Sequence, residues 1–228
     1  MSTLIEDRSL MDKLYVFKDR REAGRRLARK LMRYKGSNTM VMAIPAGGVP
    51  VADEIAKALQ LPAELVIVRK IQLPDNPEAG FGAVGPYGEM ILNEPWVAQL
   101  HLAEYEIIAQ KKKTIDNIKK RDQIFRKGRP YLDLKGKTVI LVDDGMASGY
   151  TMLAAIGFTR RLESSKVITA VPTASNKTVD FILPQVDELV CLNVRRGYYF
   201  AVADAYKNWY DLDDEEVLSI IGREPFDY

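Results

Sequence analysis

The sequence predicts an α/β fold in which helices cover a mostly parallel central sheet. Short apolar runs alternate with amphipathic or charged segments, and this alternation is typical of strand–helix–strand units. Two of the runs, at 39–44 and 138–142, lead directly into glycine-containing turns that precede a helical segment. Open α/β sheets bind ligands at such turns, so we expect a site at the carboxyl ends of these strands.

The composition fits a single domain spanning 1–228. The chain is 47% hydrophobic and 28% charged, which allows a sizeable core beneath a polar surface. Its one cysteine, Cys191, cannot form an internal disulfide, so we expect a reducing, cytoplasmic location. Neither a signal peptide nor a membrane span is expected, because the N-terminus is charged and no apolar run is long enough.

The first half of the chain predicts one strand–helix–strand unit preceded by an amphipathic helix. The helix covers 19–34, where apolar residues recur at helical spacing. A buried strand at 39–44 then enters a Pro-Ala-Gly-Gly turn, and a helix begins at Pro50, a residue suited to a first turn. The second strand covers 65–68 and ends at Arg69 and Lys70.

The middle of the chain predicts a less regular region. Prolines and glycines at 72–88 indicate a long mobile loop or a loose hairpin, and a short strand follows at 89–93. The highly charged segment 94–127 reads as helical, and we expect it to pack on the sheet edge rather than form a coiled coil. Its lysine runs lack interleaved aromatic residues, so we expect no nucleic-acid partner.

The second half returns to regular alternation. We expect, in order, a strand at 138–142, a helix at 151–161, a strand at 167–171 ended by Pro172, and a strand at 188–194. A short helix from Asp213 follows, with acidic residues at its start that complement the helix dipole.

The segment 139–151, VILVDDGMASGYT, carries the chemistry. Gly145 and Gly149 allow a sharp turn and close approach to an anion. The backbone amides of 146–149 and the start of the next helix would form an anion cradle, to which Ser148 and Thr151 add hydroxyl donors. The predicted phosphate loop consists of Gly145, Met146, Ala147, Ser148, Gly149 and Thr151.

Asp143 and Asp144 distinguish this turn from a generic phosphate loop. Two carboxylates repel a bare phosphate, but they accept hydrogen bonds from the vicinal hydroxyls of a ribose. The segment therefore predicts a ligand with both features, a ribose 5-phosphate group.

The same segment resembles the phosphoribosyl-diphosphate motif of type I phosphoribosyltransferases: four apolar residues, two acids, Gly, any residue, Ala, Ser or Thr, Gly, any residue, Thr. The resemblance extends over roughly residues 13–210 and is greatest to a group of stand-alone members without defined substrates. It implies the type I phosphoribosyltransferase fold with a small hood. It also implies a pyrophosphate site built from Ala46, Gly47, Gly48, Arg69 and Lys70.

The resemblance further implies an enzyme that uses phosphoribosyl diphosphate and Mg²⁺ and transfers ribose 5-phosphate to a base-like nitrogenous acceptor. Asp143 and Asp144 would stabilise the transition state, and Mg²⁺ would be held by ligand oxygens without direct protein ligands. Glu78 would belong to a flexible loop that closes over the site. The acceptor would stack near Tyr198, Tyr199 and Phe200, and a homodimer is left open because the family is commonly dimeric.

One position departs from the resemblance. The group reads Pro-Arg-Gly-Gly in the pyrophosphate loop, where this chain has Ala46. Arginine offers a forked set of donors to diphosphate oxygens, and alanine offers none. Ala46 therefore leaves open an alternative, a regulatory protein that senses phosphoribosyl ligands. A third interpretation is a phosphoribosyl-linked hydrolase or phosphatase, which would need a placed base or metal cluster that Asp143 and Asp144 alone do not supply.

Two other signals are discounted. Residues 80–85 spell GxGxxG, but a proline-containing loop precedes them and Pro86 follows, so the strand and helix that a dinucleotide site requires are missing. His101, the only histidine, lies in the charged helical segment and is expected to have a surface role.

Overall fold

A six-stranded sheet forms the centre of the protein. The structure, a computed structural model, describes residues 2–197 and 199–226, apart from the side chains of Pro77 and Glu78. All five strand pairings in this sheet are parallel, which confirms the predicted α/β class. The strands, in their order across the sheet, are β1 (Thr3–Ile5), β9 (Glu188–Arg195), β8 (Lys166–Ser175), β7 (Thr138–Val142), β2 (Thr39–Ala43) and β3 (Ala63–Leu65).

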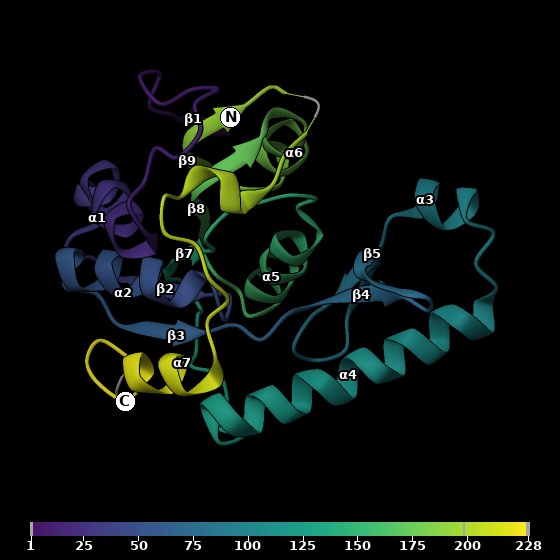
Figure 1. The fold of residues 1–228 in the computed structure, drawn as a ribbon. Coiled ribbons are helices and arrows are strands. Elements are labelled where there is room, and N and C mark those ends of the chain that lie inside the picture. The colour runs from purple at the N-terminus through teal and green to yellow at the C-terminus, as the bar shows by residue number, and fades with distance from the viewer. Residues whose placement is uncertain (1, 198, 227–228) are drawn as a thin grey trace.

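Helices cover both faces of this sheet, which explains why its central strands are apolar throughout rather than alternating (Figure 1). α1 (Arg20–Leu31) and α2 (Gly48–Leu59) pack with one set of alternate strand residues, including Val41 and Ile140. α5 (Tyr150–Arg161) and α6 (Asn176–Ile182) pack with the other set, including Met42 and Leu141. The in-register pairing of β2 with β7 brings the two turns that follow these strands together.

A smaller antiparallel sheet projects from the main sheet together with two helices (Figure 1). Of the two alternatives for 72–88, the hairpin is observed. It is irregular, because the pairing of the first two strands shifts on either side of Gln72. The elements are β4 (Arg69–Leu73), β5 (Asn76–Val84), β6 (Met90–Leu92), α3 (Glu94–Gln99) and α4 (Glu104–Arg126).

The C-terminal end of α4 reaches the edge of the main sheet, as predicted. There Arg126 Nε lies 2.9 Å from Glu64 Oε1 of β3, and the rest of the helix runs along the small sheet. α4 has 23 residues and carries charges along its length. Among the described residues, no helix is both long enough and apolar enough to cross a bilayer.

The chain after β9 crosses the carboxyl ends of the main strands before it reaches α7 (Asp214–Ile221) (Figure 1). We call residues 201–213 the C-terminal strap. It begins with the short helix η3 (Val202–Ala205), and Tyr206 then forms an isolated bridge with Phe17 ahead of α1. The strap therefore lies against the turns where the sequence predicts a site.

Several boundaries and elements differ from expectation. The predicted helical segment 94–127 forms two helices, α3 and α4, separated by residues 100–103, and α2 begins at Gly48, two residues before Pro50. β8 continues through Pro172 to Ser175, because its pairing with β9 resumes at Thr173 and only one amide donor is missing. β3 ends at Leu65, and the buried residues 66–68 lead out of the main sheet toward β4. β1 and α6 were not predicted. The remaining 3₁₀ turns are η1 (Met32–Tyr34), which completes the predicted 19–34 helix, and η2 (Leu183–Gln185).

Candidate active site

Asp143 and Asp144 follow directly after β7, at the carboxyl edge of the sheet. The Asp144 amide donates a hydrogen bond to Asp143 Oδ1 at 2.8 Å, which fixes the first carboxylate against the turn. Burial and the negative charge of Asp144 raise the pKa of Asp143 well above its usual range. Burial also raises the pKa of Asp144, although a nearby arginine opposes this shift.

That arginine is Arg20, the first residue of α1, which the sequence did not single out. Its Nε lies 2.8 Å from Asp144 Oδ2, and the two side chains are only 8% and 13% exposed. Tyr206 of the C-terminal strap also holds Asp144, because its hydroxyl donates to the Asp144 carbonyl at 2.5 Å. The two aspartates therefore have different surroundings, and only Asp144 has a cationic partner among the described residues.

The predicted phosphate loop packs against η3 and α6. Gly145 packs so closely under Val202 that an added Cβ would lie 2.5 Å from Val202 Cγ1. The Thr178 hydroxyl donates a hydrogen bond to the Ala147 carbonyl. Gly149 has a φ of +83° and precedes α5, so it supplies the left-handed turn that starts the helix. Thr178 is thus a further residue that the sequence did not indicate.

One detail of the expected cradle is wrong. The Met146 amide donates to the Thr173 carbonyl at 2.9 Å, and its side chain is buried in the core, so this amide does not face a ligand. The amides of Ala147, Ser148 and Gly149 have no acceptor among the described residues. Together with the first turn of α5 they form a smaller cradle than predicted.

The predicted pyrophosphate loop lies beside the aspartates, between β2 and α2. The Pro45–Ala46 peptide bond is cis. Gly47 touches the second aspartate, since an added Cβ would lie 2.0 Å from Asp144 Oδ2. Gly48 is equally confined, with Val142 O only 2.5 Å from an added Cβ. Ala46 is partly buried and packs against the core.

A cavity of about 510 Å³ joins the predicted pyrophosphate and ribose sides. Its volume lies within the range usual for small-molecule sites. Nine residues line it: Ile44, Pro45, Val68, Arg69, Lys70, Gln72, Asp143, Thr151 and Asp211. Burial and the positive charge of Arg121 lower the pKa of Arg69, which has no ion-pair partner among the described residues. A mostly buried, unpaired guanidinium favours an anionic ligand.

A second cavity of about 200 Å³ adjoins the first, and Lys70 and Thr151 line both. One wall is the loop from Gly145 to Thr151 with Val202, and the other is Gly80 and Gly82 of β5. Gly80 lies against the Lys70 side chain, because an added Cβ would be 2.2 Å from Lys70 Cγ. The GxGxxG segment is therefore part of an antiparallel strand that packs Lys70, which confirms that it is no dinucleotide fingerprint.

The residues expected on the acceptor side do not line either cavity, as far as they are described. Tyr199 is 92% exposed, and the Arg195 guanidinium lies 5.2 Å from the centre of the Phe200 ring. Tyr198 and the side chain of Glu78 lie outside the described residues. Asp211 of the C-terminal strap lines the larger cavity instead, although no sequence pattern marked it.

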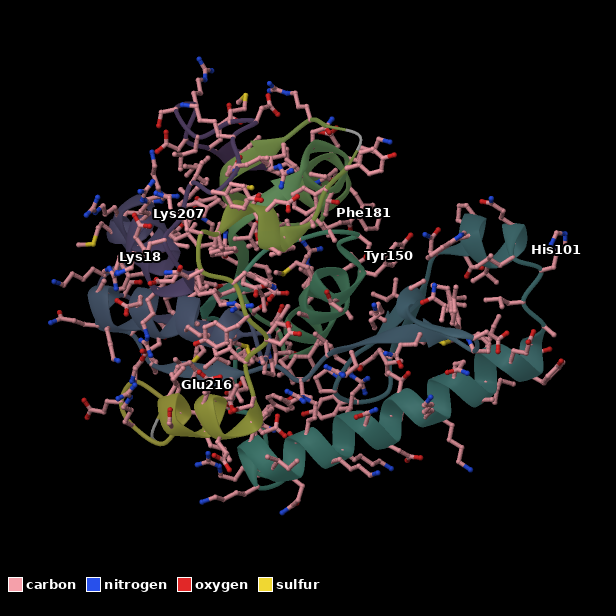
Figure 2. The ribbon with its side chains drawn as sticks, viewed as in Figure 1. Lys18, His101, Tyr150, Phe181, Lys207 and Glu216 are labelled. Carbon is pink, nitrogen blue, oxygen red and sulfur yellow. The ribbon has the colours of Figure 1, made fainter. Side chains whose placement is uncertain are left out.

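Other chemically reactive side chains lie away from these cavities. His101 is exposed in the turn between α3 and α4, at the far end of the projecting sheet, as the sequence predicted (Figure 2). Cys191 is buried in β9, and burial raises the pKa of its thiol to about 12. Among the described residues, no three His, Cys, Asp or Glu side chains are grouped as a metal site would require.

Comparison with known proteins decides the family. Residues 13–204 match the family described as "Phosphoribosyl transferase domain". The chain belongs to the phosphoribosyl transferase family. TT1426, a Thermus thermophilus protein of known crystal structure, is 36% identical to this phosphoribosyl transferase family member, and the two structures superpose with a TM-score of 0.73. The superposition covers 90% of this chain and 96% of TT1426.

Two relatives in Mycobacterium tuberculosis, from strains CDC 1551 and H37Rv, are provisionally named phosphoribosyl transferases. Each is 38% identical over 213 residues, which are 93% of this chain and 48% of the relative. This phosphoribosyl transferase family member thus spans about half the length of these relatives. Residues 13–204, which match the domain, include both predicted loops, and the alignments with the two relatives extend further, over Tyr206 and Asp211 of the strap.

Proposed function

We propose that the protein transfers ribose 5-phosphate from phosphoribosyl diphosphate to a nitrogenous, base-like acceptor. One observation carries this proposal: the 510 Å³ cavity has Arg69 and Lys70 on one side and Asp143 and Thr151 on the other. Cations suit the diphosphate, and the carboxylate suits the ribose hydroxyls. The adjoining 200 Å³ cavity, with its unpaired loop amides, suits the 5-phosphate.

The reaction forms a bond between an acceptor nitrogen and C1 of the ribose while the bond from C1 to the diphosphate oxygen breaks. The electron pair of that bond leaves with pyrophosphate, and an acceptor nitrogen that carries a proton gives that proton up to water. Positive charge develops on the ribose ring, and Asp143, which lines the cavity, would stabilise it, whereas Asp144 is paired with Arg20. Arg69 and Lys70 would stabilise the negative charge that accumulates on the leaving group. The walls formed by Ile44 and Val68 would limit access of water to the reacting carbon.

Magnesium fits this site as an ion carried by the ligand. No described group of three carboxylate, cysteine or histidine side chains provides a preformed metal cage, and Mg²⁺ commonly binds substrate phosphates with few protein ligands. When bound, the ion would neutralise diphosphate charge and so make pyrophosphate a better leaving group. The hydrolase alternative would need a cluster of metal-binding side chains, and the described residues contain none.

Calorimetry with phosphoribosyl diphosphate and Mg²⁺ tests the proposal. We expect wild type to bind, Asp143→Asn to bind at least about ten-fold more weakly, and His101→Gln to match wild type because His101 lies far from the cavities. Pyrophosphate release with a panel of bases then reports transfer. Absence of binding by wild type would reject the proposal.

Ala46 supports a second candidate, a regulatory protein that binds phosphoribosyl ligands without turnover. Ala46 packs against the core and brings no cation to the pyrophosphate loop. Ala46→Arg separates the two candidates. Transfer by wild type, or transfer gained by Ala46→Arg, supports an enzyme. Binding of ribose 5-phosphate compounds without turnover in either form supports the regulatory protein.

A further inference from the structure

Arg20 connects three parts of the site that are distant in sequence. Its Nε donates to Asp144 Oδ2 at 2.8 Å, and its Nη1 donates to the Tyr210 carbonyl at 2.8 Å. The guanidinium carbon lies 3.9 Å from the centre of the Trp209 ring, within the range of a cation–π contact. The side chain is 8% exposed, so these contacts take place away from bulk water.

Asp144 is held on its other sides as well. Gly47 of the predicted pyrophosphate loop lies directly against its carboxylate, where any side chain at position 47 would collide with Oδ2. The Tyr206 hydroxyl holds its carbonyl. Asp143 lines the large cavity, whereas Asp144 is absent from the described lining and points toward Arg20. The adjacent aspartates therefore have separate tasks.

The contact with the Tyr210 carbonyl fixes the peptide that leads to Asp211. Asp211 lines the 510 Å³ cavity, so the position of this wall depends on where the strap is held. The strap from Ala205 onward lies beyond residues 13–204, which match the phosphoribosyl transferase domain, but within the 213 residues that align with the Mycobacterium tuberculosis relatives. Arg20 thus ties the motif after β7 to the strap that crosses the cavity.

We propose that Arg20 is a positioning residue for the reaction cavity: it holds Asp144 against the pyrophosphate loop and the strap against the cavity, which leaves Asp143 to meet the ribose. This inference rests on the proposed function, since that function assigns a ligand to the cavity. A purely structural role would also explain a buried ion pair, so the test needs readouts that stability alone does not change.

The first readout needs no ligand. The carboxyl ¹³C signals of the aspartates are followed against pH by NMR in wild type, Arg20→Gln, Arg20→Lys and Arg21→Gln. Arg20, Asp143 and Tyr206 face Asp144, and Tyr206 stays neutral because burial raises its pKa well above the usual value. We expect Asp144 to titrate at higher pH in Arg20→Gln, because burial remains while the cation is lost.

Arg21→Gln is the matched control. Arg21 is the next residue of α1, and it pairs with Asp53 and Glu54 rather than with the motif. We expect its Asp144 titration to match wild type. An unchanged Asp144 titration in folded Arg20→Gln would overturn the inference, whatever the ligand experiments give.

The second readout is the affinity for phosphoribosyl diphosphate with Mg²⁺, measured by calorimetry at several pH values. We expect Arg20→Gln to bind about ten-fold more weakly or worse, and Arg21→Gln to stay within about two-fold of wild type. Arg20→Lys keeps the charge but cannot reach Asp144 and the Tyr210 carbonyl together, so it should restore the Asp144 titration and not the full affinity.

The two proposals fail in different ways. No binding by wild type rejects the proposed function, and the carboxyl titration then still decides the role of Arg20. If wild type and folded Arg20→Gln bind phosphoribosyl diphosphate with equal affinity, Arg20 is not a positioning residue. The proposed function is unaffected by that result. If Arg20→Gln does not fold, Arg20→Lys decides, because unchanged affinity in that variant contradicts the inference.

Discussion

Arg20 Nε and Asp144 Oδ2 lie 2.8 Å apart although 124 residues separate them in the chain. The pair is almost fully buried and links the start of α1 to the end of β7. Removing one member of a buried pair leaves an uncompensated charge, which is far more costly than removing both. The pair therefore gives a measurable thermodynamic signature.

A double-mutant cycle measures that signature. We expect Arg20→Gln and Asp144→Asn each to lower the free energy of unfolding by about 3 kcal/mol, and the double variant to lose less than the sum of the two. Chemical denaturation at neutral pH provides the values. A coupling energy near zero would mean that the contact contributes nothing. Arg21→Gln, whose side chain is more exposed, should cost under about 1 kcal/mol.

The pKa of Asp143 makes stability depend on pH in a predictable direction. Because the pKa is raised in the folded state, that state keeps a proton which the unfolded chain loses above about pH 4. The stabilisation is complete below the unfolded pKa and is lost as pH rises through the folded pKa. Asp143→Asn carries no ionisable group, so its stability relative to wild type should increase from pH 4 upward and then level off. Parallel denaturation curves measure this, and a constant difference across pH would contradict it.

Gly47 and Gly157 give opposite predictions for the same substitution. The methyl group added by Gly47→Ala would overlap the Asp144 carboxylate, so this change should displace that carboxylate from Arg20, destabilise the fold and abolish detectable phosphoribosyl diphosphate binding. Gly157 lies within α5, and no atom lies within 4 Å of an added Cβ. Gly157→Ala should therefore stabilise the protein by about 0.5–1 kcal/mol. Thermal unfolding and calorimetry of both variants test the pair.

The sequence predicted the sheet and the two loops well because their determinants are local. Continuous apolar runs mark β2 and β7, and the glycines and acids that follow them mark the turns. Parallel pairing then brings those turns together without further information. For the same reason Asp143, Arg69 and Lys70 were identified from the sequence, and the structure places them around one cavity.

Arg20 and Asp211 could not be found in this way, because their roles depend on tertiary contacts. Arg20 reads as one of several arginines on an amphipathic helix, and only the fold turns it toward Asp144. Asp211 lies in an irregular strap whose path is set by the Arg20 contact with Tyr210 and by the pairing of Tyr206 with Phe17. The Met146 amide was assigned to the ligand because nothing local reveals that Thr173 accepts from it.

Arg69 should distinguish the diphosphate from the 5-phosphate. It lines the 510 Å³ cavity but not the smaller one beside the phosphate loop. Arg69→Gln should therefore weaken phosphoribosyl diphosphate binding by about ten- to a hundred-fold, as expected for loss of a charge-assisted hydrogen bond, while ribose 5-phosphate binding changes little. Calorimetry with both ligands measures the difference. If Arg69→Gln weakens the binding of both ligands equally, Arg69 does not contact the diphosphate alone, and this prediction is wrong.

Thr178 gives the complementary prediction for the phosphate loop. Its hydroxyl fixes the Ala147 carbonyl, and the amides that follow that carbonyl form the remaining cradle. Thr178→Val should loosen the loop and weaken ribose 5-phosphate binding by several-fold, at a stability cost of about 1 kcal/mol.

Thr159→Val is the matched control for Thr178→Val. Thr159 is also buried, and its hydroxyl donates to the Ile156 carbonyl at 3.0 Å within α5, outside both cavities. We expect a similar loss of stability without loss of affinity, because the bond that is removed supports no ligand-facing amide. If both variants weaken ribose 5-phosphate binding equally, the effect of Thr178 reflects general destabilisation. A loss of affinity confined to Thr178→Val places the 5-phosphate on the amides of Ala147, Ser148 and Gly149.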